Sequence, residues 1–214
     1  MIQLDIWSDV LCPFCYIGKR HFEKALEQFS DRDQVKINWH SFQLDPFAQK
    51  KSGQNIYEML AKKYGRDIEW AKTANERVIL MAKESGLNFQ MEKMIPTNSF
   101  DAHRLIHLAK TQNLQDEVHE KLFSAVFEEG KDISDHATLI QIGKEIGLDE
   151  KIVAEMLKST DFKEEVNRDR DQAVAGGISA VPAFVFNQKY LVSGAQPVET
   201  FVQTLQEIGQ EIVK

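Results

Sequence analysis

The feature that most constrains this chain is a pair of cysteines near its N-terminus, spaced as Cys12-Pro13-Phe14-Cys15. The 214-residue sequence contains no other cysteine. An apolar run over residues 3–8 reads as a strand and leads into the pair, and a run over 17–29 with helical period follows it. Two thiols at a turn between a strand and a helix are the arrangement that reversible dithiol chemistry uses. The pattern therefore predicts a redox-active pair.

Other uses of a cysteine pair fit the sequence less well, although an inert remnant of such a motif stays as an alternative. Two cysteines are too few for a disulfide-stabilised scaffold. A single Cys-x-x-Cys supplies two of the four ligands of a structural zinc site, and the six histidines are scattered. His103 and His107 are spaced to share one helix face, but no glutamate follows His103 as a metalloprotease motif requires. We expect a solvated helix face there and no metal site.

Composition excludes several classes of partner. The net charge of −7 argues against non-specific binding to nucleic acid or to an anionic membrane surface. No apolar run approaches the roughly 20 residues that span a bilayer. Residues 1–5 lack a basic segment followed by an apolar stretch, so they do not resemble a secretory signal. We expect a cytoplasmic protein that binds neither nucleic acid nor membrane.

The order of predicted elements indicates an α/β fold interrupted by helices. Residues 35–41 alternate between apolar and polar side chains and predict a second strand, which gives a β-α-β opening with a parallel strand pair. Nearly every segment from Pro46 to Ser159 has helical period, and the α/β pattern returns afterwards as helix, two strands and helix. This is the thioredoxin-like arrangement with a large all-helical insertion. We expect a thioredoxin-like domain over 1–45 and 160–214, and an inserted helical domain over 46–159.

Four segments resemble those of a known family. The resemblance covers Ser8-Asp9 with Cys12 to Gly18, the segment 177–185 around Val181-Pro182, and the tripeptide 194–196. The fourth segment is 96–99, which includes Asn98, together with 102–105, which includes His103. Together they resemble the DsbA-like oxidoreductases of the FrnE type, which belong to the thioredoxin superfamily. Related proteins include 2-hydroxychromene-2-carboxylate isomerases and kappa-class glutathione transferases, which typically have serine at the first active-site position. Cys12 stands at that position here, which favours dithiol redox chemistry.

The two cysteines have different predicted roles. Cys12 lies at the expected N-terminus of the helix, where unpaired N–H groups and the helix dipole favour a thiolate, so we expect it to be the attacking and more exposed sulfur. Cys15 lies one turn further on and faces inward, as a resolving thiol or, alternatively, as a small buried hydrophobe. Phe14 replaces the histidine of strongly oxidising periplasmic members. We therefore expect weaker stabilisation of the Cys12 thiolate than in those proteins.

The resemblance also implies how substrate is bound. It implies that the Val181-Pro182 peptide bond is cis, that Pro182 faces Cys12, and that Val181 offers its backbone to an extended substrate strand. The alternative is a proline that merely starts a strand. Pro13, Phe14, Val181 and Pro182 are the expected substrate-binding residues, and the family segment suggests that Asn98 and His103 line the groove over Cys12. Asp9 is expected to cap a turn or, alternatively, to relay protons.

Three functions compete on this evidence. The first is a thiol–disulfide oxidoreductase acting on protein or low-molecular-weight thiols and disulfides. The second is a glutathione-dependent isomerase or transferase acting on an aromatic metabolite in a pocket under the helical insertion. The third is a non-catalytic binding module. We expect no bound cofactor, with glutathione as a candidate co-substrate, and the sequence leaves open both the oligomeric state and whether the pair oxidises, reduces or isomerises.

Overall fold

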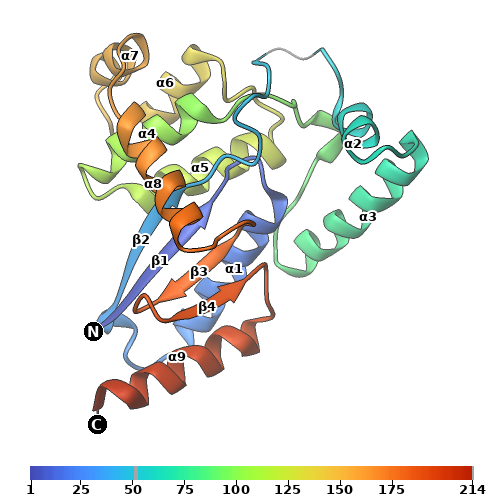
Figure 1. Ribbon diagram of the computed structural model, residues 1–214. Helices are drawn as coiled ribbons and strands as arrows, with labels where there is room; N and C mark the ends of the chain where they lie inside the picture. The colour runs from blue at the N-terminus through green and yellow to red at the C-terminus, as the bar shows by residue number, and fades with distance from the viewer. Residues whose placement is uncertain (51–52, 214) are drawn as a thin grey trace.

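The centre of the computed structural model, which describes residues 1–50 and 53–213, is a mixed sheet with the strand order β2-β1-β3-β4 (Figure 1). The strands are β1 (Ile2–Ser8), β2 (Val35–Ser41), β3 (Ala183–Phe186) and β4 (Tyr190–Ser193). β1 runs parallel to β2, with Ser8 opposite Ser41, and antiparallel to β3. The β-α-β opening with a parallel strand pair is therefore confirmed, and β1 begins one residue earlier than the sequence predicts.

Helices make up most of the rest of the described chain. They are α1 (Pro13–Glu27), α2 (Ile56–Tyr64), α3 (Ile68–Glu84), α4 (Phe100–Lys110), α5 (Gln115–Phe127), α6 (His136–Glu145), α7 (Glu150–Lys158), α8 (Lys163–Ala175) and α9 (Val198–Val213). Short 3-10 turns occur at Arg32–Gln34 and Met91–Lys93. The predicted α/β fold with a long helical stretch between its strands is confirmed. None of the helices in the described ranges is both long and apolar enough to cross a membrane.

Helices cover both faces of the sheet. α1 and α9 pack against one face, where Phe22 of α1 and Phe201 of α9 meet Phe184 of β3 in a buried aromatic cluster. α8 covers the other face, where Ala173 packs with Trp7. Apolar area removed from water on both faces stabilises this layer. Figure 1 shows α9 along the lower edge and α8 crossing in front of β1 and β2.

A second core joins the remaining helices to the start of α1. Tyr16 stacks on Phe123 of α5 with ring centroids 4.8 Å apart, and Cys12 and Cys15 belong to the same buried cluster. The first turn of α1 thus lies between the sheet and the helices α2 to α7, which positions both thiols at their junction. The division into domains at 45/46 and 159/160 stays a prediction. Helix α8 contacts both sides of that division, because it packs on β2 and on α4.

Candidate active site

Cys12 lies at the N-cap of α1, where the chain leaves β1 through a tight turn. Its N–H donates to the Asp9 carbonyl at 3.0 Å, and the Cys15 N–H donates to the Cys12 carbonyl at 3.0 Å. Pro13 occupies the first turn of the helix, where its missing N–H leaves no hydrogen bond unmade. The first turn of α1 carries no acidic residue, so no carboxylate there opposes the attraction of the helix N-terminus for negative charge. This position suits a thiolate.

Cys15 lies further inside the protein. Both cysteines are free thiols and both are buried, with exposed fractions of 4% for Cys12 and 1% for Cys15. The prediction that Cys12 is the more exposed thiol therefore holds by a narrow margin. Burial, and then the neighbouring Cys12 thiol, raise the pKa of Cys15 well above its ordinary value. Cys15 is consequently a protonated thiol at neutral pH in the dithiol state.

The segment before β3 faces the N-terminus of α1. The Val181–Pro182 peptide bond is cis, as the sequence resemblance implies. The Cys12 Sγ lies 3.7 Å from the Val181 carbonyl oxygen, and Pro182 is buried with its own carbonyl accepting from the Gly194 N–H at 2.8 Å. These contacts bring together segments that lie at opposite ends of the sequence.

Gly18 permits this close approach. A Cβ atom at Gly18 would lie 3.1 Å from the Pro182 Cγ and 3.5 Å from the Ala195 Cα. Most side-chain carbons do not tolerate the shorter of these distances without movement of a neighbour. The residue at position 18 must therefore be small for Pro182 to sit against α1.

Asp9 ties the turn before Cys12 to two other parts of the protein. Its Oδ1 accepts from the Leu11 N–H at 3.2 Å, its Oδ2 accepts from the Leu44 N–H at 2.8 Å, and its Oδ1 lies 3.4 Å from the His103 Nε2. Burial by itself would raise the pKa of Asp9, but His103 and the Leu44 and Leu11 N–H groups hold it below its usual value. Asp9 is therefore a buried, charged carboxylate that caps the turn, as predicted.

Comparison with known proteins identifies the family to which this chain belongs. The family described as the DSBA-like thioredoxin domain matches residues 3–206. The chain belongs to this family. Because the match covers nearly the whole chain, it supports both the thioredoxin-like fold and the assignment to an oxidoreductase family. The FrnE-type placement is consistent with the match.

Solved structures of similar proteins give the same fold. A protein described as a "probable DsbA oxidoreductase" from Streptomyces coelicolor is 35% identical, with a TM-score of 0.94 over 99% of this chain and 91% of that one. The cytosolic disulfide reductase DsbM from Pseudomonas aeruginosa is 15% identical, with a TM-score of 0.67 over 97% of this chain and 98% of its own. A 2-hydroxychromene-2-carboxylate isomerase is 14% identical, with a TM-score of 0.73 over 99% and 98%. The last two likenesses show a shared fold.

The two histidines of α4 are not on a solvated face in this DSBA-like chain, so that prediction is wrong. His103 is fully buried and His107 is 7% exposed. Every residue of α4 from 101 to 109 is buried, because α5, α6, α7 and α8 all pack against this helix. His107 Nε2 lies 3.1 Å from the Asp169 Oδ2, whereas His103 faces Asp9. The two rings therefore serve different carboxylates.

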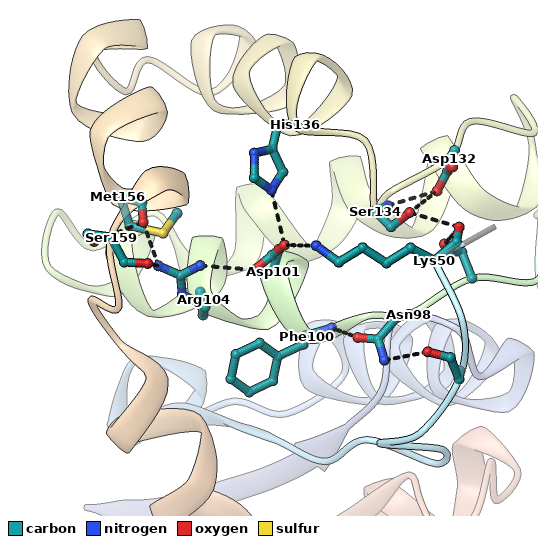
Figure 2. A network of polar contacts seen from close by, with 12 residues as sticks. Lys50, Asn98, Phe100, Asp101, Arg104, Asp132, Ser134, His136, Met156 and Ser159 are labelled. Atoms are coloured by element: carbon teal, nitrogen blue, oxygen red, sulfur yellow. Dashed lines mark hydrogen bonds and ion pairs between the residues drawn. The ribbon is translucent and has the colours of Figure 1, made fainter.

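The two groove residues predicted in the helical segment differ in burial, and the groove position of Asn98 stays a prediction. The prediction for His103 is wrong, because its side chain has no exposed surface. Asn98 is half-buried, and its amide donates to the Ala48 carbonyl at 2.9 Å and to the Pro46 carbonyl at 3.3 Å, while its Oδ1 accepts from the Phe100 N–H (Figure 2). Asn98 therefore holds the backbone of the loop after β2 through these hydrogen bonds.

That loop, residues 44–50, is fixed along its whole length. At the start of the loop, the Leu44 N–H donates to the Asp9 carboxylate. At its end, the Lys50 carbonyl accepts from the Thr97 hydroxyl at 2.9 Å. The Lys50 ammonium lies 2.7 Å from the Asp101 carboxylate (Figure 2). Leu44 and Phe47 nevertheless remain 43% and 93% exposed. A fixed backbone thus presents apolar side chains to solvent on a loop that starts at the active-site turn.

Figure 2 also shows how Asp101 is held. Arg104 donates to it at 2.9 Å and to the Ser159 carbonyl at 2.8 Å, and His136 lies 3.1 Å from it. These charged contacts join α4 to the loop and to the end of α7.

Sequence reasoning assigned no role to Ser8, which the structure buries at the end of β1. Ser8 is 1% exposed, and its hydroxyl has no hydrogen-bond partner among residues 1–50 and 53–213. The available signal was a polar residue at the buried end of an apolar strand. Within the same ranges, no group of three or more His, Cys, Asp or Glu side chains could hold a metal ion.

Proposed function

We propose that this chain is a thiol–disulfide oxidoreductase in which Cys12 attacks and Cys15 resolves. The observation that carries the proposal is the position of Cys12, which is the N-cap residue of α1 and whose Sγ lies 3.7 Å from the Val181 carbonyl oxygen, next to cis-Pro182. A helix N-terminus favours the thiolate, which is the nucleophile in disulfide exchange. Family membership supports oxidoreductase chemistry on this pair.

The exchange has two steps. The Cys12 thiolate attacks one sulfur of a substrate disulfide, forms a mixed disulfide and releases the other substrate sulfur as a thiolate. Cys15 then loses its proton and attacks the Cys12 sulfur, so that the Cys12–Cys15 disulfide forms and the second substrate thiolate leaves. The substrate disulfide is reduced to two thiols and the dithiol pair is oxidised. The reverse sequence oxidises a substrate dithiol.

Substrate approaches from the side of the site where apolar side chains are exposed. Phe14 is 38% exposed beside Cys12, and Val181 is half-buried with its carbonyl at the attacking sulfur. Pro13, Phe14, Val181 and Pro182 are the substrate contacts in this proposal, with the Val181 backbone available to an extended strand. Protein thiols and glutathione are both candidate substrates, since DsbM, which has this fold, has been solved with glutathione. We place the reaction in the cytoplasm.

Insulin reduction in the presence of glutathione tests the proposal. We expect activity in the native chain and none above background in Cys12→Ser. When Cys15→Ser is mixed with oxidised glutathione, the Cys12 thiolate should attack its disulfide and release one glutathione thiolate, and the resulting mixed disulfide at Cys12 should persist for mass spectrometry because the resolving sulfur is missing. Equal insulin reduction by the native chain and Cys12→Ser would contradict the proposal.

The same variants separate the competing functions. A glutathione-dependent isomerase needs a nucleophile at position 12 but not at 15, so full turnover of an aromatic substrate by Cys15→Ser would favour that function. A binding module would keep its function in the variant lacking both thiols. If the two cysteines act as a redox pair, both Cys15→Ser and the variant lacking both thiols should lose insulin reduction.

A further inference from the structure

His40 of β2 lies between two buried carboxylates. Its Nδ1 lies 2.9 Å from the Asp169 Oδ1 on α8, and its Nε2 lies 3.0 Å from the Asp5 Oδ1 on β1. The two aspartates are 7% and 6% exposed. A neutral imidazole has one N–H and can donate to only one carboxylate, whereas an imidazolium donates to both. The geometry therefore indicates a protonated His40 that joins α8 to the sheet.

The charged groups around this ring support the protonated state. Burial by itself would raise the pKa of Asp169, but its contacts with His107 and His40 hold it below its usual value, so this carboxylate is charged. Burial by itself would lower the pKa of His40, but Asp169 and Asp5 raise it. The titratable groups that face the ring are thus Asp5 from β1, Asp169 from α8 and, across Asp169, His107 from α4.

The same ring stacks on Trp7, which connects it to the substrate-binding segment. The two ring centroids are 4.4 Å apart with an interplanar angle of 14°, an arrangement in which a protonated imidazole is attracted to the indole face. The Trp7 Nε1 donates to the Asp169 carbonyl at 3.0 Å. Trp7 shares a buried cluster with Ile178, and Val181 packs against that cluster. Contacts therefore run from His40 through the indole to the cis peptide bond.

Helix α8 also leads directly into the substrate-binding segment. The helix ends at Ala175, and the Ile178 N–H donates back to the Ala173 carbonyl at 2.8 Å. A shift of α8 away from the sheet would therefore carry Ile178 with it and disturb Val181. The Val181 backbone is the group that the proposed function offers to an extended substrate strand.

We propose that protonated His40 is a positioning residue for peptide substrates, which holds α8 and the Val181 backbone in the geometry that binds an extended strand. The proposal rests on the function proposed above and adds a residue that acts on substrate binding without touching substrate. When His40 loses its proton with rising pH, one carboxylate loses its hydrogen bond and faces a ring nitrogen with a lone pair. The joint between α8 and β1 then weakens, and peptide binding weakens with it.

NMR of the imidazole tests the charge of His40 independently of activity. In protein with isotope-labelled histidine, proton–nitrogen correlation spectra show whether each ring carries one or two protons, and the resonances lost in His40→Gln assign this ring. We expect two protons on His40 at pH 7, where an unperturbed histidine with a pKa of about 6.5 is mostly neutral. Asp169→Asn removes one charged acceptor and should lower the pKa of His40. A ring with one proton at pH 7 would overturn the proposal.

Insulin reduction between pH 6.5 and 9 tests the positioning role. Ionisation of Cys12 also changes over this range, so the native chain and His40→Gln are compared at each pH. We expect the KM for insulin to be roughly tenfold higher in His40→Gln at pH 6.5, with kcat within about twofold, because hydrogen bonds to a charged group are lost. The two KM values should converge toward pH 9, where the native ring has also lost its charge. In Asp169→Asn the rise in KM should move to lower pH together with the NMR titration.

Two controls separate positioning from loss of structure. Alkylation of Cys12 by iodoacetamide needs no extended strand, so its rate should follow the same pH profile in the native chain and in His40→Gln. His119→Gln is the matched variant. The His119 ring also stacks on a tryptophan, Trp39, with centroids 4.2 Å apart, but burial lowers the pKa of His119 to about 3, so this ring is neutral throughout the assay. His119→Gln should leave the KM for insulin unchanged at every pH.

The outcomes are distinguishable. Equal KM values in the native chain and His40→Gln at pH 6.5, an equal rise of KM in His119→Gln, or a changed alkylation profile in His40→Gln would overturn the positioning role and leave the proposed function intact. If the native chain fails to reduce insulin at any pH, the proposed function falls, and the positioning role falls with it whatever the charge of His40.

Discussion

The Nε2 atom of His103 lies 3.4 Å from the Oδ1 atom of Asp9, and both side chains are buried. Asp9 stands in the turn before Cys12 and His103 stands on α4. The pair therefore links the active-site turn to the helices outside the sheet. Because Asp9 also accepts from Leu11 and Leu44, it fixes the turn and the loop after β2 together.

Removing His103 should destabilise the protein. His103→Leu leaves the buried Asp9 carboxylate with only the Leu11 and Leu44 N–H groups as partners, and a poorly satisfied buried polar group of this kind costs about 1–3 kcal/mol. Urea unfolding at pH 7 measures the loss. His136→Leu is the matched control, because His136 also contacts an aspartate but is exposed, and it should cost less than about 1 kcal/mol.

Two further measurements test whether the buried charge of Asp9 causes the loss of stability in His103→Leu. Adding Asp9→Asn to His103→Leu should recover part of the lost stability, because the uncompensated charge disappears. The pKa of Asp9 is lowered in the folded protein, so its contribution is present above its unfolded pKa of about 3.9 and is lost as pH falls through the lower folded pKa. No recovery in the double variant would contradict this account.

Gly18→Ala should impair thiol exchange. The added Cβ would lie 3.1 Å from the Pro182 Cγ, so either Pro182 or α1 must shift, at a cost of about 1–3 kcal/mol. Such a shift would change the distance between Cys12 and Val181. Gly209→Ala is the control, since its Cβ would lie 3.2 Å from the Phe29 Cζ, between α9 and the end of α1. We expect both variants to lose stability and only Gly18→Ala to lose insulin reduction.

Phe14→His should make the pair more oxidising. A positive charge beside Cys12 would stabilise its thiolate, and hence the reduced state, which moves the reduction potential to less negative values. A tenfold change in the equilibrium constant corresponds to about 30 mV, which is the size of shift we expect. Equilibration against glutathione measures it, with Phe14→Leu as the uncharged control. A more negative potential in Phe14→His would refute the prediction.

His40 should make stability fall with rising pH above its unfolded pKa of about 6.5. Its Nδ1 lies 2.9 Å from Asp169 and its Nε2 lies 3.0 Å from Asp5. Burial by itself lowers the pKa of His40, but Asp169 and Asp5 raise it above its usual value. The contribution is therefore fully present below the unfolded pKa of about 6.5 and is lost as pH rises through the folded pKa.

Unfolding curves of His40→Gln and the native chain measure this contribution. The difference in their free energies of unfolding should be largest near pH 6 and should shrink toward pH 9. A difference that stays constant over this range would show that the charge of His40 contributes nothing.

Much of the fold and the centre of the site could be predicted because their signals are local. Pro13 after Cys12 places a helix N-terminus at the first thiol, and Asp67 and Asp149 cap α3 and α7 as their positions before helical runs suggest. Pro182 was found through the family segment around it, since an isolated Val-Pro before a strand favours the trans form.

The errors concern α4, whose environment is set by distant segments. Its helical period was evident, but period alone cannot tell a helix with one buried face from one enclosed on all sides. The sequence pattern therefore predicts a solvated face for His103 and His107. The structure instead encloses α4 and buries both histidines.

The sequence by itself determined the element order, the reactive pair Cys12 and Cys15, and the position of Cys12 at the start of a helix. These depend on residues within a turn or two of one another. Only the tertiary structure decided that Asp9 lies against His103 and that Cys12 lies against the Val181 carbonyl. Such contacts follow from how the ends of β1, α1 and α4 pack, and packing depends on the shape of the whole core rather than on local pattern.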